Sequence, residues 1–139
     1  MALDFGTVRI GVAISDELRM LASARGTIPN DQRALNAIAS LAEREHVRYV
    51  VLGLPIGLTG NDTDMTRKVR DFGNKLEVKF ATREIAIELF DERLTSVMAN
   101  ANVAMSGLSK SKRERKGIRD EEAARILLQE YLERIKRPG

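Results

Sequence analysis

The stretch that decides the fold is MALDFGTVRIGVAISDE, residues 1–17, which has the pattern of a β-hairpin. Within it, Ile10, Val12 and Ile14 alternate with smaller residues, as in a β-strand over residues 9–15. Gly6 lies in the intervening turn, where its conformational freedom allows a tight reversal. The stretch therefore predicts two antiparallel strands, with Asp4 at the end of the first.

Residues 23–55 continue the sheet. Ser23–Ile28 predicts a third strand, which ends before Pro29. Apolar residues then recur at helical spacing over residues 31–46, which predicts a helix with Asn30 or Asp31 as its N-cap. Val47–Pro55 is a nearly continuous apolar run, as expected of a strand buried on both faces of a parallel sheet.

The remaining residues predict a helix over Met65–Phe80 and a fifth strand over Ala86–Arg93. The rest is predicted to be helical apart from a polar, glycine-interrupted break over Met105–Ile118, where we expect a mobile loop. The order β-β-β-α-β-α-β-α predicts an α/β fold with three antiparallel hairpin strands, followed by parallel strands joined through right-handed crossovers.

Composition sets limits on function. The 139 residues (15.5 kDa) suit a single domain over 1–139, with 43% hydrophobic, 31% charged and 4% aromatic residues. The sequence contains no cysteine, which excludes disulfides, thiolate nucleophiles and cysteine-based zinc sites. No apolar run reaches membrane-spanning length and no signal-like leader is evident, so we expect a cytoplasmic protein. A net charge of +3 permits a polyanionic partner without requiring one.

The C-terminal helix carries an acid in phase with its apolar stripe. The stripe consists of Asp120, Ala123, Ala124, Leu127, Leu128, Tyr131, Leu132 and Ile135. An acid in the first turn also suits the positive end of a helix, so Asp120 could instead be a cap. The phase alone leaves both roles open.

Asp91 and Glu92 close the fifth predicted strand, and strand alternation directs them to opposite faces. Either could instead pair with Arg93 or cap a following helix. Asp4 has its own alternative, as a turn residue next to Gly6.

Taken together, these acids favour a shared site. Ligands of open α/β sheets bind beyond the carboxyl ends of parallel strands, where Asp4 and the Asp91/Glu92 pair both lie. Carboxylates without cysteine or clustered histidine suit a hard cation such as Mg²⁺ or Mn²⁺, which would support phosphodiester hydrolysis. The only histidine, His46, has no ligand partner at a useful spacing and is interpreted as structural.

The same stretch also fits an ATP-binding interpretation, since DFGT followed by RIG could hold a phosphate against a hairpin turn. That architecture encloses its nucleotide between two domains, whereas 139 residues provide one. The sequence has neither a P-loop nor a GxGxxG pattern.

Four blocks, ALDFGTVRIGVAISD, VVLGLPIGLTG, FDERLTS and DEEAARILLQEYL, resemble the signature blocks of the YqgF family, also called RuvX. The resemblance keeps the blocks in order over nearly the whole chain. It implies an RNase H-like fold whose first strand is central in a mixed five-stranded sheet flanked by helices. It also implies a metal-dependent nuclease with an acidic set formed by Asp4, Glu92 (or Asp91) and Asp120. The strand ending in GLP carries no acid, whereas related resolvases place a glutamate there. The metal site would therefore depend more on the acids of DER.

A basic run directly precedes Asp120. It comprises Lys110, Lys112, Arg113, Arg115, Lys116 and Arg119. Such a run is often only a solvated loop, but here it would place cations where a phosphate backbone must pass. The predicted nucleic-acid contacts are therefore Lys112, Arg113, Arg115 and Lys116, together with Arg9 and Arg93.

The resulting prediction is a metal-dependent nuclease that processes the 5′ end of pre-16S rRNA during ribosome biogenesis. Two alternatives are a Holliday-junction resolvase and a nucleic-acid-binding module with an idle site. A structured nucleic acid is the expected partner, with pre-rRNA favoured and branched DNA possible. No membrane partner is expected, and the protein could be a monomer or a homodimer.

Overall fold

The computed structural model describes residues 1–57, 59–92 and 118–136. They form a five-stranded mixed sheet in the order β3-β2-β1-β4-β5. The strands are β1 (Ala2–Phe5), β2 (Arg9–Ser15), β3 (Ala22–Pro29), β4 (Tyr49–Leu54) and β5 (Ala86–Asp91). The predicted α/β architecture and the central position of the first strand are both confirmed.

β1 joins the antiparallel and parallel halves of the sheet. It pairs antiparallel with β2, with Asp4 opposite Gly11, and parallel with β4, with Leu3 opposite Leu52. β4 in turn pairs parallel with β5. The carboxyl ends of β1, β4 and β5 therefore lie at one edge of the sheet, which is where ligands bind in open α/β sheets.

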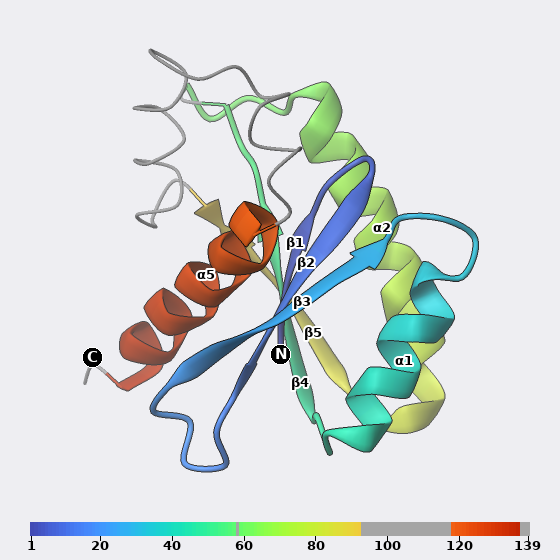
Figure 1. Ribbon diagram of the computed structural model, residues 1–139. Coiled ribbons are helices and arrows are strands. Elements are labelled where there is room, and N and C mark those ends of the chain that lie inside the picture. The colour runs from blue at the N-terminus through green and yellow to red at the C-terminus, as the bar shows by residue number, and fades with distance from the viewer. Residues whose placement is uncertain (58, 93–117, 137–139) are drawn as a thin grey trace.

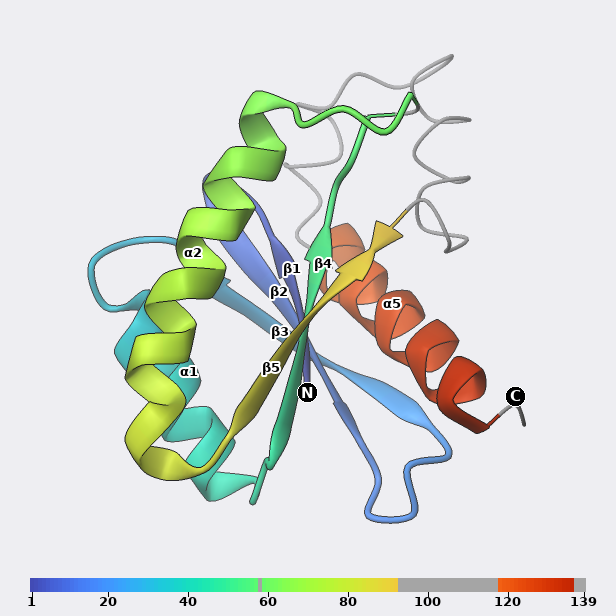
Figure 2. The ribbon, with the colours of Figure 1, turned by 180° about the vertical axis from the view of Figure 1, so that it is seen from behind.

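Helices cover both faces of the sheet (Figures 1 and 2). α1 (Ala34–Arg44) and α2 (Asp64–Phe80), the latter followed by a 3₁₀ turn over Ala81–Arg83, lie on one face, and α5 (Ile118–Lys136) lies on the other. No helix within the described ranges is long and apolar enough to cross a membrane.

Strand alternation produces a separate apolar core on each face. Leu3 of β1 and Leu52 of β4 pack with the helices α1 and α2, whereas Ala2 and Val51 pack with Ala124 and its neighbours in α5. The near-continuous apolar run of β4 is thus explained by burial on both sides.

The helix boundaries differ from the sequence prediction at α1. The helix begins at Ala34, and its cap position is Arg33, without a side-chain cap. Asp31 does not cap it, because its carboxylate instead accepts a hydrogen bond from the Arg33 backbone N–H at 2.8 Å. The predicted cap at Asn30 or Asp31 is therefore wrong, since the side chain closes a local turn before the helix starts.

Other boundaries shift by one or two residues. α2 starts at Asp64, one residue early, because Thr63 and Thr66 form a reciprocal capping box. β5 ends at Asp91, two residues before the predicted end. The predicted loop over 105–118 lies outside the described residues, apart from Ile118 at the start of α5.

Candidate active site

Two of the predicted acids meet at the sheet edge. Asp4 shares the face of β1 that Ala2 presents to α5, and Glu92 immediately follows β5. Their side chains share a hydrogen bond, although β4 separates the two strands. A hydrogen bond between two carboxyl groups requires a proton on one of them, so the pair holds one proton where two negative charges would repel.

Burial dominates the electrostatics of Glu92. It raises the pKa of this carboxyl to about 7, since a charged group is disfavoured away from water. The hydrogen bond with Asp4 acts in the opposite direction, while the charge of Asp91 raises the pKa further. The Glu92 side chain is confined between β4 and α5: a Cβ added to Gly53 would lie 3.1 Å from Glu92 Cδ and 3.0 Å from Leu127 Cδ2.

The two neighbouring acids of the fifth strand separate as alternation predicts. Leu89 faces α2, where its Cδ2 would lie 3.4 Å from a Cβ added to Gly73. Asp91 shares the parity of Leu89, whereas Phe90 belongs to the core beneath α5. Glu92, rather than Asp91, is therefore the acid that the structure brings to Asp4.

Asp120 lies nearby, but it is paired with a cation. Its Oδ2 is 3.0 Å from Nε of Arg9, and both side chains are about three-quarters buried, with 24% and 28% exposed. Within the described part of the chain, no three His, Cys, Asp or Glu residues are grouped closely enough to hold a metal. The structure thus brings Asp4 and Glu92 together and places Asp120 beside them on Arg9.

Gly11, which the sequence pattern did not single out, sets the position of Asp120. Gly11 lies opposite Asp4 in the sheet, and a Cβ there would collide with the backbone carbonyl of Asp120 and lie 3.0 Å from the N–H nitrogen of Glu121. Only a glycine lets the first turn of α5 approach the strand this closely. A glycine inside a strand pattern, directly opposite an acid, was the available signal.

The other predicted nucleic-acid contacts lie outside the described residues. They are Arg93, Lys112, Arg113, Arg115 and Lys116. His46 lies just after α1 in the left-handed conformation (φ 55°) and is exposed, far along the chain from any acid of the site. Its structural interpretation rests on this helix-ending position.

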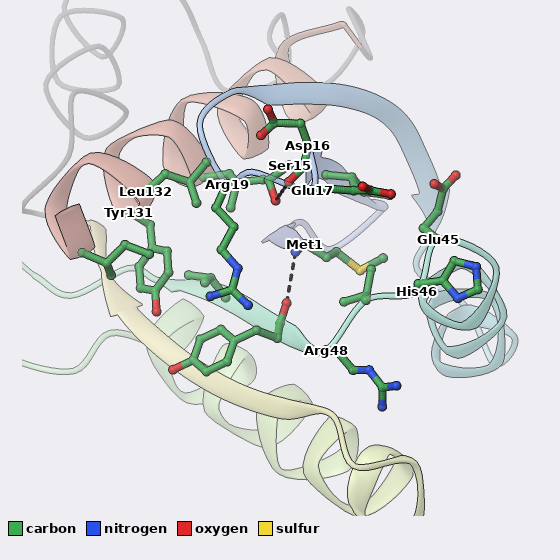
Figure 3. A pocket seen from close by; sticks show the side chains of 16 residues that line it. Met1, Ser15, Asp16, Glu17, Arg19, Glu45, His46, Arg48, Tyr131 and Leu132 are labelled. Atoms are coloured by element: carbon green, nitrogen blue, oxygen red, sulfur yellow. Dashed lines mark hydrogen bonds between the residues drawn. The ribbon is translucent and has the colours of Figure 1, made fainter.

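A cavity in the described part of the chain lies away from the acids. It measures about 450 Å³ and opens beyond the start of β1, between Ser15 at the end of β2 and Tyr49 at the start of β4. Figure 3 shows Met1 at its centre, donating to the Tyr49 carbonyl at 3.0 Å, with Arg19 and Tyr131 in the wall. Because Asp4 lies at the opposite end of β1, the cavity and the acids are separate features.

The donors at the acidic edge suit a hard cation. Oxygen ligands on adjacent carboxylates are those that Mg²⁺ and Mn²⁺ prefer, and a cation could replace the proton that Asp4 and Glu92 share. Asp120 could add a third carboxylate only by leaving Arg9. The fit therefore rests on Asp4 and Glu92, and the metal itself stays a prediction.

A mixed five-stranded sheet with its first strand central, helices on both faces and carboxylates at one edge defines an RNase H-like domain. The chain belongs to the RuvX family, because the model of that family, described as "Holliday junction resolvase", matches residues 1–134.

Three similar proteins carry the name "Putative pre-16S rRNA nuclease". The relative from Bacteroides thetaiotaomicron is 35% identical over 133 residues, covering 96% of this chain and 94% of its own length. One from Koribacter versatilis is 40% identical over 136 residues, covering 96% and 86%. A third, from Anaeromyxobacter sp. (strain K), is 39% identical over 136 residues, covering 96% of both chains.

Proposed function

We propose that this chain is a metal-dependent nuclease that hydrolyses phosphodiester bonds in pre-16S rRNA during 5′-end processing. The observation that carries the proposal is the hydrogen-bonded pair of Asp4 and Glu92 at the carboxyl edge of an RNase H-like sheet. The names of the nearly full-length relatives supply the substrate. One nuclease domain over residues 1–139 and a cytoplasmic location complete the proposal.

In the proposed mechanism, Asp4 and Glu92 hold Mg²⁺ or Mn²⁺ through their carboxylate oxygens, and Asp120 and Asp91 are the further predicted ligands. When bound, such a cation offsets the carboxylate charges, polarises a phosphate and lowers the pKa of water. The confined carboxylate of Glu92, held between Gly53 and Leu127, fixes one donor in place. The guanidinium of Arg9 and the basic residues before Asp120 supply positive charge for the nucleic-acid backbone.

The first test replaces Asp4 by Asn. An amide can still donate a hydrogen bond to Glu92, so the fold should persist, whereas the loss of one anionic donor should lower metal-dependent cleavage by about a hundredfold or more. Cleavage is measured on a pre-16S rRNA 5′ fragment with Mg²⁺ or Mn²⁺, and folding by thermal unfolding. Asp64→Asn is the matched control, because Asp64 is an exposed acid in α2 and should leave the rate unchanged.

Asp120→Asn is tested alongside, with the same expected loss. Full activity in either the Asp4 or the Asp120 variant would contradict the assignment. Cleavage that persists unchanged in EDTA would contradict the need for a metal.

The description of the matching family model favours a second candidate, a Holliday-junction resolvase. Symmetric cleavage of a four-way junction needs two active sites related by a two-fold axis. Assaying the same proteins on a four-way DNA junction, with the oligomeric state measured by light scattering, separates the two functions. Junction cleavage by a homodimer would favour the resolvase, and a monomer that cleaves only the rRNA fragment would favour the processing nuclease. Binding without cleavage of either would favour the idle binding module.

A further inference from the structure

The ion pair between Arg9 and Asp120 connects strand β2 to the first turn of α5. Arg9, Gly11 and Ala13 alternate along the face of β2 that packs against α5, so Arg9 lies under the first turn of that helix. Asp120 Oδ2 is 3.0 Å from its Nε, and Asp120 does not join Asp4 and Glu92 in a three-acid group within the described residues. The guanidinium of Arg9 is therefore the charged partner of the third carboxylate in this structure.

The contact is a charge contact rather than a directed hydrogen bond. Nε of Arg9 is fully buried, and within the described part of the chain it has no hydrogen-bond partner, despite its 3.0 Å approach to Asp120. A misaligned N–H contributes less than a linear one, so the pair lacks part of the energy that a well-aligned guanidinium and carboxylate would gain. A phosphate that offers better geometry could compete with Asp120 for this guanidinium.

We propose that Arg9 is a positioning residue that holds Asp120 away from the Asp4–Glu92 pair, and that a nucleic-acid phosphate releases Asp120 to the metal by taking over the guanidinium. The inference rests on the proposed function, since it assumes that the acids bind a cation. Metal binding and nucleic-acid binding then reinforce each other, as reciprocal coupling requires. Without nucleic acid, the protein binds its cation through Asp4 and Glu92 alone.

The test is a double-mutant cycle of Arg9→Gln and Asp120→Asn, which isolates the interaction between the two residues. Mn²⁺ affinity is measured by calorimetry without nucleic acid. In the wild-type background, Asp120→Asn should change the dissociation constant by less than about twofold, because Arg9 withholds the carboxylate. In the Arg9→Gln background, the same change should weaken Mn²⁺ binding by about tenfold. Simple charge removal at Arg9 would instead give equal effects of Asp120→Asn in both backgrounds.

The same four proteins are titrated with a fluorescent structured RNA in EDTA, where no metal-dependent cleavage occurs. Asp120→Asn should strengthen RNA binding by roughly fivefold when Arg9 is present, because the guanidinium becomes available to a phosphate, and should give no gain in the Arg9→Gln background. Arg25→Gln is the matched control, since Arg25 forms a similar ion pair with Glu45 at 2.7 Å on the edge strand β3. It should leave both titrations unchanged.

Arg9→Lys serves as the conservative variant in case glutamine destabilises the fold. It keeps a cation beside Asp120 and should reproduce the wild-type insensitivity of Mn²⁺ binding to Asp120→Asn. Equal effects of Asp120→Asn with and without Arg9, in both titrations, would overturn the inference while leaving the nuclease intact. Failure of all the proteins to bind Mn²⁺ would overturn the metal dependence of the proposed function and the inference with it.

Discussion

At the scale of single residues, Glu92 is a carboxyl group whose surroundings disfavour its charged form. Confinement beside Gly53 and Leu127 raises its pKa to about 7, so the carboxyl stays partly protonated at neutral pH in the protein without metal. Its partner Asp4 can share that proton only because β1 and β5 end at the same edge, with β4 between them. The pair thus combines a carboxyl group with a raised pKa, that of Glu92, with a second carboxyl group at the same edge of the sheet.

This environment predicts a pH dependence of stability. The folded protein binds more protons at Glu92 than the unfolded chain does, so the free energy of unfolding should fall as the pH rises from about 4.5 to about 7. The loss attributable to Glu92 should reach at most about 3 kcal/mol above that range. Urea unfolding in EDTA at several pH values measures it.

Glu92→Gln provides the comparison, because the amide cannot ionise but can still hydrogen-bond to Asp4. The difference in stability between this variant and the wild type should grow in favour of the variant as the pH rises to 7. Parallel curves for the two proteins would show that Glu92 has an ordinary pKa.

At the scale of elements, the first turn of α5 is fixed by the glycine beneath it. Gly11→Ala would drive a methyl group into the Asp120 carbonyl, so α5 must shift away from β2. We expect a loss of stability of about 1–3 kcal/mol, as for other overpacked contacts, and loss of cleavage because Asp120 moves with the helix. Chemical unfolding and the cleavage assay measure the two effects.

Gly73→Ala on the opposite face is the matched control. Its Cβ would meet only Leu52 Cδ2 and Leu89 Cδ2, at 3.3 and 3.4 Å, and alanine is the better helix former within α2. This variant should therefore change stability by less than about 1 kcal/mol and leave cleavage intact. If Gly11→Ala behaved in the same way, the close approach of α5 would not be needed to place Asp120.

Local patterns predicted these elements well, and long-range contacts account for what they missed. Alternation along residues 9–15 predicted the strand correctly, and the helical stripe from Asp120 onwards predicted the buried face of the helix except at Ile135, which is exposed. The separation of Asp91 from Glu92 also followed from strand parity alone. The pairing of Arg9 with Asp120 could not be predicted, because the two residues lie more than a hundred positions apart and meet only through the contact at Gly11.

At the scale of the whole molecule, positive charge is concentrated in one run. Residues 110–119 carry a net charge of +5, so the rest of the chain is net −2 despite an overall +3. The acidic edge would therefore repel nucleic acid unless this run, which directly precedes Asp120, contacts the backbone.

The charge distribution predicts steeply salt-dependent RNA binding. Replacing Lys112, Arg113 and Arg115 together by Ala should lower the slope of log affinity against log salt concentration by about 2 to 3, since each phosphate contact contributes roughly 0.7–0.9. Fluorescence anisotropy in EDTA at several salt concentrations measures it. The matched control replaces three cations of α2 (Arg67, Lys68 and Lys75), and an equal drop there would mean that only total charge matters.

The position of α5 across the hairpin also bears on the order of assembly. Asp4 lies in β1 and Glu92 directly follows β5, whereas Asp120 lies on α5, which packs against β2 on the opposite face from α1 and α2. A nascent chain that has folded its sheet and first two helices still lacks the third acid. The maturation of the enzyme is thereby tied to the docking of α5, so a half-synthesised chain still on its own ribosome would not yet carry the complete acid set.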